Sequence, residues 1–325
     1  MKSTIEIRQF FLPVSGMLAL FFLSRTYSYL LFHNIAEALS IIVSVSVFVL
    51  IWNSRSFMEN NYFIFLGISF IFVAIADFLH SLAYFGMGIF PGYGKDLPTQ
   101  LWIIARYIQA ISFLLAPAFL TRKLNTRLTF TAFTLAAAGS IASAFLRIFP
   151  SCFAEGQGLT VFKVASEYII CVIFTVAAYE LFKKRQYIDD EIFLFMIGSM
   201  ALSILAELSF TLYADVDDFF NMTGHYLKIL SFLLIYKGII EIGLKKPYSL
   251  LYRELKQREE ALQKALNEVK TLRKILPICA NCKKIRDDKG YWNQVEAYIS
   301  DHVEVEFSHG LCPECARKLY PTIKI

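Results

Sequence analysis

Long apolar segments, each able to cross a lipid bilayer, recur along the first three quarters of this sequence. A membrane-spanning helix needs about 20 mostly apolar residues, and the chain as a whole is 56% hydrophobic. The first apolar block, residues 10–52, is too long for one helix, so we predict two helices there with a turn near residues 25–34. Further helices are predicted at residues 62–84, 100–120, 128–149, 161–182, 191–213 and 226–243. The expected fold is an all-α polytopic membrane protein with eight transmembrane helices in a domain covering residues 1–244.

Lys and Arg are concentrated in the loops on one side of the predicted bundle. The loops on that side contain Lys2, Arg8, Arg55, Arg122, Lys123, Arg127, Lys183, Lys184, Arg185, Lys245 and Lys246. The loops on the other side contain Lys95, Asp96, Glu155, Asp215, Asp217 and Asp218. Because positively charged loops stay in the cytoplasm, we predict that both termini are cytoplasmic, which agrees with an even number of helices.

Ionisable side chains lie inside several apolar segments, all in the half of the bundle that we predict to face outward. Asp77 and His80 are one helical turn apart and share a face, and Arg106 lies about 9 Å into the next helix at 1.5 Å per residue. Charges inside a membrane are costly and usually mark a functional site. We therefore predict an outward-facing ligand pocket. Its candidate residues are His33, Glu37, Asp77, His80, Trp102, Arg106, Glu167, Glu207 and His225, the last at the outer start of the eighth helix.

Other interpretations of these polar residues stay open. They could join the helices as buried pairs, such as Asp77 with Arg106, without binding any ligand. His33, His80 and His225, with the nearby carboxylates, could also ligate an unidentified metal or a haem, although histidines near an interface are more often simply hydrogen-bonded. A transporter is disfavoured because the inner half of the bundle lacks a polar pathway and no inverted repeat is evident.

Four motifs carry a resemblance to a known family. They are Leu31-Phe32-His33-x3-Glu37-x2-Ser40, Trp52-Asn53-Ser54-Arg55, Asp77-Phe78-Leu79-His80-Ser81-Leu82-Ala83-Tyr84-x-Gly86-Met87-Gly88-x-Phe90, and Thr99-Gln100-Leu101-Trp102-x3-Arg106-Tyr107. Residues from about 10 to 240 resemble the third family of bacterial membrane-associated sensor domains. The resemblance implies an input domain of the bacterial inner membrane that normally precedes a histidine kinase, cyclase or PAS module. It does not name a stimulus.

A charged segment without Gly or Pro, residues 248–276, follows the last apolar segment. Heptad a positions fall on Leu255, Leu262, Val269 and Leu276, and d positions on Leu251, Arg258, Ala265 and Leu272. This seam predicts a parallel coiled coil and a homodimer, with one polar break at Arg258. We assign residues 245–276 to a coiled-coil signalling linker. The alternative is an amphipathic helix on the membrane surface, which is less favoured because no Trp or Phe anchors it.

Two Cys-x2-Cys pairs lie in the last segment, residues 277–325. Cys279 and Cys282 form the first pair, Cys312 and Cys315 form the second, and 29 residues separate the pairs. This pattern is typical of a structural zinc site with four cysteine ligands. A segment of this size cannot hold a core without such a staple, so we predict a small α+β zinc module. The remaining cysteines, Cys152 and Cys171, are expected to be unpaired.

The alternatives for the cysteine pairs are a redox-active thiol pair, or a zinc site in which His302 or His309 replaces one cysteine. The segment also resembles a small cysteine-rich module at the C-terminus of bacterial PAS and receiver proteins. The motifs that carry this resemblance are Leu276-Pro277-Ile278-Cys279, Cys282-Lys283-Lys284-Ile285-Arg286-Asp287-Asp288, Gly290-Tyr291-Trp292, Ser308-His309-Gly310 and Cys312-Pro313-x-Cys315.

These features predict a bacterial membrane sensor and transducer. A small ligand or metal in the pocket would act through a dimeric coiled coil on the cytoplasmic zinc module. Residues 244–325 contain no phospho-accepting His box, ATP site or cyclase motif, so we expect no enzyme activity in this chain and a cytoplasmic kinase or cyclase as partner. No nucleic-acid partner is expected. The alternative is a metal- or haem-dependent membrane redox protein that uses the outer His/Asp/Glu cluster.

The loop charges give a testable topology. Single cysteines introduced as Asp96→Cys and Asp217→Cys should react with a membrane-impermeant maleimide in intact cells, because their loops face outward. Lys184→Cys should react only after the cells are opened. Labelling of Lys184→Cys from outside intact cells would show that the bundle has the opposite orientation to the predicted one.

Overall fold

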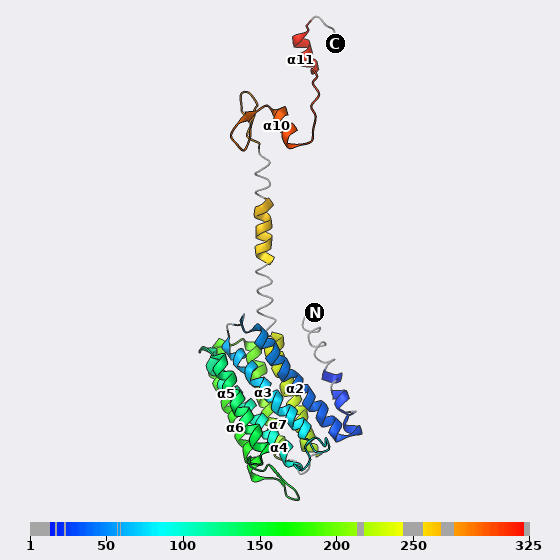
Figure 1. The fold of residues 1–325 in the computed structure, drawn as a ribbon, viewed down its shortest axis with the longest axis vertical. Helices are drawn as coiled ribbons and strands as arrows, with labels where there is room; N and C mark the ends of the chain where they lie inside the picture. The colour runs from blue at the N-terminus through cyan, green and yellow to red at the C-terminus, as the bar shows by residue number, and fades with distance from the viewer. Residues whose placement is uncertain are drawn as a thin grey trace. The chain divides into compact units, whose positions relative to one another are not determined.

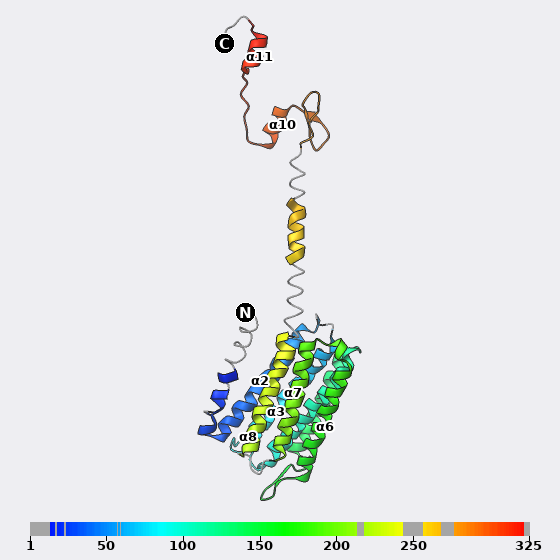
Figure 2. The same ribbon diagram turned by 180° about the vertical axis from the view of Figure 1, so that it is seen from behind.

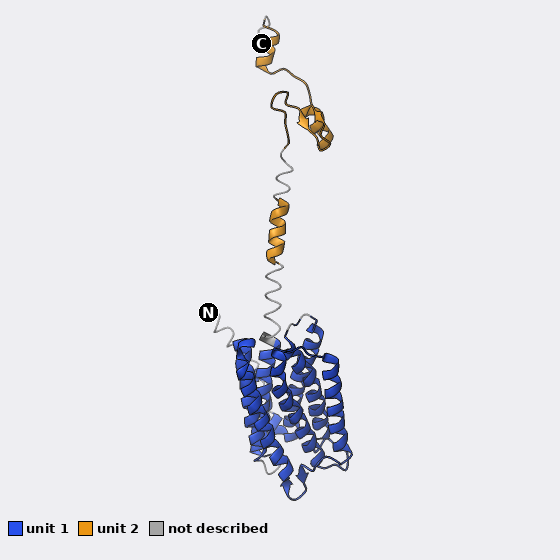
Figure 3. Cartoon of the chain, turned by 90° about the vertical axis from the view of Figure 1, so that its left-hand side faces the viewer, with its two compact units in different colours: residues 1–248 blue, residues 249–325 orange. Residues whose placement is uncertain are grey.

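The computed structural model describes residues 14–16, 18–22, 24–56, 58, 60–212, 218–242, 256–267 and 276–321. The chain divides into two compact units, Met1–Tyr248 and Ser249–Ile325, which are coloured separately in Figure 3. The first unit is a helical bundle, and the second carries the cysteine pairs. Each unit is described here by itself.

The membrane unit consists of long helices that lie side by side (Figure 1). Residues 14–16, 18–22 and 24–27 are helical and precede Ser28. The elements that follow are α2 (Tyr29–Ser54), α3 (Asn61–Ala83), α4 (Asp96–Leu115) with the 3₁₀ turn η1 (Ala116–Leu120), α5 (Thr126–Phe145), the strands β1 (Phe153–Ala154) and β2 (Gly158–Leu159), α6 (Val161–Lys183), the 3₁₀ turn η2 (Arg185–Tyr187), α7 (Asp190–Phe210), and α8 (Phe219–Ile235), which continues as the π-helical segment η3 (Tyr236–Ile242). The two short strands pair antiparallel within the loop between α5 and α6.

Polar N-cap residues determine where most of these helices begin. In α2 the Ser28 side chain accepts a hydrogen bond from the Leu31 amide at 3.2 Å, which satisfies a donor that the helix leaves unpaired. Side chains in the same position cap five other helices: Asn60, Asn125, Thr160, Asp189 and Asp218. Ser28 lies inside the turn predicted at residues 25–34, so it separates the two predicted helices of the first apolar block.

Six helices of the described part are long and apolar enough to cross a membrane: α2, α3, α4 with η1, α5, α6 and α7. The first predicted helix falls partly outside the described residues, and α8 with η3 covers the eighth. The number eight therefore stays a prediction. One position needs correction. His225 was expected at the outer start of the eighth helix, but α8 begins at Phe219, so His225 lies in its second turn and is buried. Asp218 caps the helix before the apolar stretch begins, which moves its start.

The membrane unit is organised around a closed ring of six helices. Neighbouring helices pack in the order α2, α3, α4, α6, α7, α8, and α8 packs back on α2. Figure 2 shows α7 and α8 side by side from behind. The fifth helix, α5, packs outside the ring against α3 and α4. Accordingly 78% of the most apolar stretch of α3 is buried inside the protein, whereas only 11% of the corresponding stretch of α5 is buried. The interior of the ring is thus enclosed on all sides by helices.

Small residues let the ring helices approach closely, as is usual where membrane helices pack. A Cβ added to Gly67 of α3 would lie 2.7 Å from Ile51 Cγ2 and 2.8 Å from Ile51 Cβ on α2. Between α7 and α8, a Cβ at Gly198 would meet Leu234 at 2.9 Å, and one at Gly224 would meet the Phe210 ring at 2.5 Å. These contacts leave no room for a larger side chain.

The described part of the second unit holds a helix at residues 256–267 and a small α+β segment. Strands β3 (Ile285–Arg286) and β4 (Trp292–Asn293) pair antiparallel, and α10 (Val295–His302) and α11 (Pro313–Leu319) follow. Of the described residues in this unit, Ile285 and Ala316 are the buried ones. The segment therefore has almost no hydrophobic core. The remainder of the predicted coiled coil lies outside the described residues.

The contact between Gly67 and Ile51 predicts that Gly67→Ala destabilises the bundle by about 1–3 kcal/mol, because Ile51 is branched at Cβ and cannot turn away from the new methyl group. Gly139→Ala on α5 is the matched control, since a Cβ there meets nothing within 4 Å and alanine favours a helix over glycine by about 1 kcal/mol. Thermal unfolding of the detergent-solubilised protein should show a lowered midpoint only for Gly67→Ala. Equal midpoints for the two variants would contradict this packing.

Candidate functional site

The nine side chains predicted to form the pocket are all buried, and every ring helix contributes at least one. They are His33 and Glu37 on α2, Asp77 and His80 on α3, Trp102 and Arg106 on α4, Glu167 on α6, Glu207 on α7 and His225 on α8. The helices therefore direct their ionisable residues into the ring.

Three histidines gather near one end of the ring. The Nε2 atoms of His33 and His80 are 3.1 Å apart, and the ring centroids of His33 and His225 are 4.9 Å apart at right angles. Tyr84 stacks on the other side of His33 at 3.5 Å between centroids. His80 is held from behind, because its Nδ1 lies 2.7 Å from the carbonyl oxygen of Pro98. Hydrogen bonds and stacking thus orient His33 and His80, while His225 is placed by ring contacts.

A network of buried ion pairs lies next to the histidines. Arg106 Nη2 donates to both carboxylate oxygens of Asp77, at 2.5 and 2.6 Å, while its Nη1 donates to the side-chain oxygen of Gln109. Lys228 Nζ lies 2.6 Å from Glu37 Oε2 and 3.4 Å from Asp77 Oδ2. Lys228 on α8 therefore joins Glu37 on α2 to Asp77 on α3. A buried charge of this kind is stable only with such partners.

Trp102 lies beneath this network. The Lys228 ammonium is 4.5 Å from the centre of the Trp102 ring, and the Arg106 guanidinium is 4.7 Å from it. Cations favour the face of an indole ring. Trp102 therefore supports both cations and also borders the histidines, with its ring centre 5.4 Å from that of His80.

Two of the predicted residues do not join this network. Glu167 is paired within its own helix, with Oε1 2.5 Å from Lys163 Nζ, and Lys163 also donates to the Phe210 carbonyl at 2.5 Å. Glu207 is buried, and its Oε2 makes no hydrogen bond. Seven of the nine predicted residues thus lie around Glu37 and Asp77, and Glu167 lies apart in its pair with Lys163. A single ligand pocket for all nine stays a prediction.

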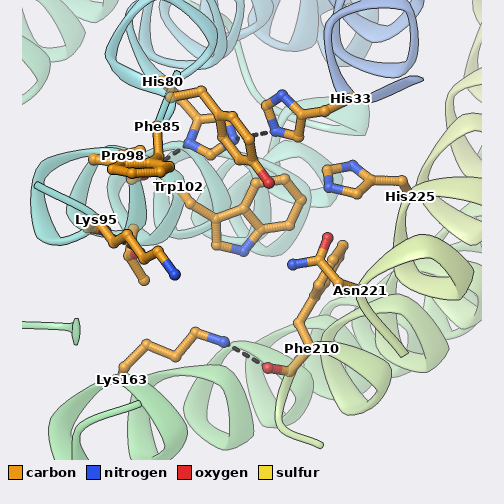
Figure 4. Close-up of a pocket in the computed structure, with 12 residues that line it drawn as sticks. His33, His80, Phe85, Lys95, Pro98, Trp102, Lys163, Phe210, Asn221 and His225 are labelled. Carbon is orange, nitrogen blue, oxygen red and sulfur yellow. Dashed lines mark hydrogen bonds between the residues drawn. The ribbon is translucent and has the colours of Figure 1, made fainter. Parts of the chain in front are cut away.

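A small cavity opens between the two groups, and Figure 4 shows the side chains around it. Its volume is about 30 Å³, which is room for about two water molecules or one ion. Four predicted residues line it: His33, His80, Trp102 and His225. Its other polar neighbours include Lys95, Lys163 and Asn221. A haem is far larger than this space and would require the helices to separate.

Two buried lysines of the site were not predicted, although the sequence contains a signal for each. Lys228 follows His225 by three residues and Lys163 precedes Glu167 by four, so each shares a helix face with a residue that was predicted. Both are buried in the ring, at 3% and 1% exposure. A lysine in an apolar segment is as costly as a carboxylate.

The cysteine pairs of the second unit form two local turns. Lys283 has φ +60° directly after Cys282, and the Lys283 amide donates to the Cys279 carbonyl at 3.0 Å. The backbone amide of Cys282, followed by that of Asn281, lowers the pKa of the Cys279 thiol. In the second pair the backbone amide of Cys315 does the same for the pKa of Cys312, which is the N-cap of α11. Both turns favour the thiolate, the form that binds metals.

The structure brings together the two cysteines of each pair but does not gather all four around one point. Among the described residues, the group with three ligand atoms close enough to hold a metal is His33, Glu37 and His225. Cys152 and Cys171 are unpaired. Zinc binding by Cys279, Cys282, Cys312 and Cys315 therefore stays a prediction.

The membrane unit matches a known protein family. Residues 24–247 match the family model of the MASE3 membrane-associated sensor domain. The match does not include the cysteine-rich segment, and neither a curated protein nor a solved structure matches the chain. Because the matched residues make up well over half of the sequence, this chain belongs to the MASE3 family of membrane-associated sensor domains.

Proposed function

We propose that this protein is a membrane-embedded sensor and transducer. A small ligand or a metal binds among the buried polar residues of the ring, and the signal passes through residues 245–276 to the cysteine-rich unit. The observation that carries this proposal is the position of Lys228. It joins α8, the last helix of the ring, to Glu37 of α2 and Asp77 of α3. A change at the cavity therefore reaches the helix that leads to the second unit.

Lys228 and the end of α8 support a transmitting role for this helix. His225 lines the cavity, and Lys228, one turn later, belongs to the ion-pair network. After Ile235 the helix changes to the π-helical segment Tyr236–Ile242, and such segments are frequent at functional sites. A rotation or shift of α8 would thus move both the network and the start of the linker.

The linker would carry the signal as a dimer. Within the described helix 256–267, the predicted a position Leu262 is 74% exposed in the single chain. A leucine at this position of a heptad seam is suited to packing against a second copy. With both termini in the cytoplasm of a bacterial inner membrane, the cysteine-rich unit would meet a cytoplasmic signalling protein such as a kinase or cyclase.

Zinc fits the cysteine-rich unit as a structural ion. The donor set is four thiols in two turns whose backbone amides favour thiolates, and the unit buries almost no apolar side chain. Cys279, Cys282, Cys312 and Cys315 would hold the ion, which would supply the folding energy that a core of this size cannot. The folded unit would then serve as the output or docking platform.

A metal-dependent membrane redox protein is the second candidate function. The observation in its favour is that one ligand atom from each of His33, Glu37 and His225 lies within 4.8 Å of the others. We rank it below sensing because residues 24–247 match a sensor-domain family and the cavity of about 30 Å³ has no room for a haem beside these residues.

Signal transmission predicts coupling between Lys228 and the linker. A disulfide between two copies at Leu262→Cys should form readily in membranes, whereas Glu260→Cys, at an outward heptad position, should not react. When Lys228→Met is combined with Leu262→Cys, the rate of disulfide formation should change by about fivefold or more, the size of a typical coupling. The reason is that the loss of Lys228 frees α8 from α2 and α3. Dimer formation is followed on non-reducing gels.

The control is Lys183→Met, since Lys183 forms an exposed pair with Glu180 outside the ion-pair network. It should leave the crosslinking rate unchanged. If neither lysine variant alters the rate while the protein level stays normal, the ion-pair network serves only to hold the helices together.

The cysteine pattern predicts that one zinc ion per chain depends on the two pairs. Elemental analysis of the purified full chain should show one equivalent lost in Cys279→Ser and in Cys312→Ser. Cys171→Ser, His302→Gln and His309→Gln should retain it. Chelation should make residues 277–325 sensitive to protease without affecting residues 60–242, because metal binding supplies the folding energy of the small unit. A protease-resistant unit after complete zinc removal would contradict the structural role.

A further inference from the structure

The described residues include three side chains in the ring whose ligand atoms are arranged as for a metal. One ligand atom from each of His33, Glu37 and His225 lies within 4.8 Å of the other two, and all three residues are buried. Each also has a buried atom that makes no hydrogen bond: His33 Nδ1, Glu37 Oε1 and His225 Nδ1. Buried polar atoms are normally paired. Glu37 Oε1 and His225 Nδ1 face one another at 3.2 Å and His33 Nδ1 has no hydrogen-bond partner, so one ligand shared by the three atoms would satisfy them.

The proton positions on the histidines follow from the Pro98 carbonyl. A carbonyl oxygen only accepts, so His80 Nδ1, at 2.7 Å from it, must carry a proton. The Nε2 of a neutral His80 is then an acceptor, and His33 Nε2, at 3.1 Å, must be the donor. His33 Nδ1 therefore keeps a free lone pair. Histidines that bind metals usually donate their other ring N–H in this way, which fixes the ring and the tautomer.

Glu37, like His33, has one atom that is available to a ligand. Its Oε2 is taken by Lys228 at 2.6 Å, while Oε1 lies 3.2 Å from His225 Nδ1 without the alignment of a hydrogen bond. Two ligands that bind one tetrahedral ion at about 2.0–2.1 Å are about 3.4 Å apart. The separation of these two atoms is thus close to the spacing that a shared ion imposes.

We propose that His33, Glu37 and His225 bind a divalent first-row transition metal, with His80 positioning His33. Imidazole and carboxylate ligands suit Zn²⁺, Cu²⁺ and related ions. The cavity lined by His33 and His225 has room for one ion or about two waters and lies next to these two ligands. This inference rests on the proposed sensor function and names the class of its ligand. A water molecule bound by the same atoms is the competing occupant.

The metal would lie close to the Lys228 ammonium, because both contact the carboxylate of Glu37. Like charges at such a distance repel strongly in a poorly solvated site. Lys228→Met should therefore tighten metal binding, by about tenfold or more. A bound water would show no such response, so this variant separates the two occupants.

The test uses the full chain with Cys279, Cys282, Cys312 and Cys315 changed to serine, so that the thiol site does not contribute. Zn²⁺, Co²⁺ and Cu²⁺ are each offered by equilibrium dialysis, and bound metal is measured by elemental analysis. One equivalent per chain is expected for at least one ion, with a Co²⁺ visible spectrum typical of nitrogen and oxygen ligands. Glu37→Gln and His225→Gln should abolish it, and His80→Gln should weaken it by about tenfold to a hundredfold.

Glu167→Gln is the matched control, since Glu167 is a buried carboxylate of the same ring that pairs with Lys163 outside the group. It should bind metal like the parent, and size-exclusion chromatography checks that each variant is folded. The proposal is overturned if no ion binds above the detergent blank. It is also overturned if Glu37→Gln binds as well as Glu167→Gln, or if Lys228→Met fails to tighten binding.

The sensor function can be judged separately. The crosslinking measurement at Leu262→Cys needs no metal, so a coupling between Lys228 and the linker would survive a negative binding result. Conversely, a metal that binds as expected but leaves the crosslinking rate unchanged would be a structural ion of the ring and not its signal.

Discussion

The buried ammonium of Lys228 connects three helices of the ring through two carboxylates. It lies 2.6 Å from Glu37 Oε2 on α2 and 3.4 Å from Asp77 Oδ2 on α3. In an apolar environment an unpaired ion costs several kcal/mol, so removing one partner is far more destabilising than the pair is stabilising. The positions of α2, α3 and α8 are therefore coupled by the need to keep these charges paired. Arg106 on α4 binds the carboxylate of the same Asp77, so it extends the coupling to α4.

The glycine contacts make this coupling sensitive to small movements. Gly224 directly precedes His225 in α8, and a Cβ there would meet the Phe210 ring of α7 at 2.5 Å. Phe210 in turn packs on Trp102 and His225, with centroids 4.6 and 5.2 Å apart. A closely packed interior tends to switch between discrete arrangements because it cannot deform continuously. A ligand at the histidines would thus act on side chains that already determine how α7 and α8 fit together.

Sequence reasoning found the residues that must be inside the ring and one pair that they form there, Asp77 with Arg106, but it did not find the lysine partners of Glu37 and Glu167. An apolar segment makes each of Asp77, Arg106 and Glu167 conspicuous, because burying such a group is costly whatever surrounds it. Which charges meet depends on helix rotation, and the sequence of one helix does not contain this. Lys163 illustrates the difficulty, because a lysine in the first turn of a membrane helix normally extends to the interface. In the structure it turns inward to Glu167 and the Phe210 carbonyl.

The helix boundaries and the cysteine-rich unit show the same division. Apolar length located the helices, while the start of α8 depends on the Asp218 cap, which displaced His225 from the rim to the interior. The spacing of Cys279, Cys282, Cys312 and Cys315 indicates a ligand set, and the local turns of both pairs agree with it. The distance between the two cysteine pairs is not determined by either turn. The unit also has almost no hydrophobic core that would bring the pairs together.

The proposed metal and Lys228 share Glu37, and this competition supplies a physical route from binding to movement. An ion on Oε1 withdraws negative charge from the carboxylate and weakens its attraction for the ammonium on Oε2. Asp77 Oδ2, at 3.4 Å, is the nearest other anion that the structure shows for Lys228. Binding by His33 and Glu37 of α2 and His225 of α8 would therefore hold these two helices together at the histidines, while it shifts the preference of Lys228 from Glu37 on α2 toward Asp77 on α3. Because Lys228 is part of α8, the helix that precedes the linker would follow this change of partner, and occupancy of the site would be converted into a displacement at the end of the bundle from which the linker follows.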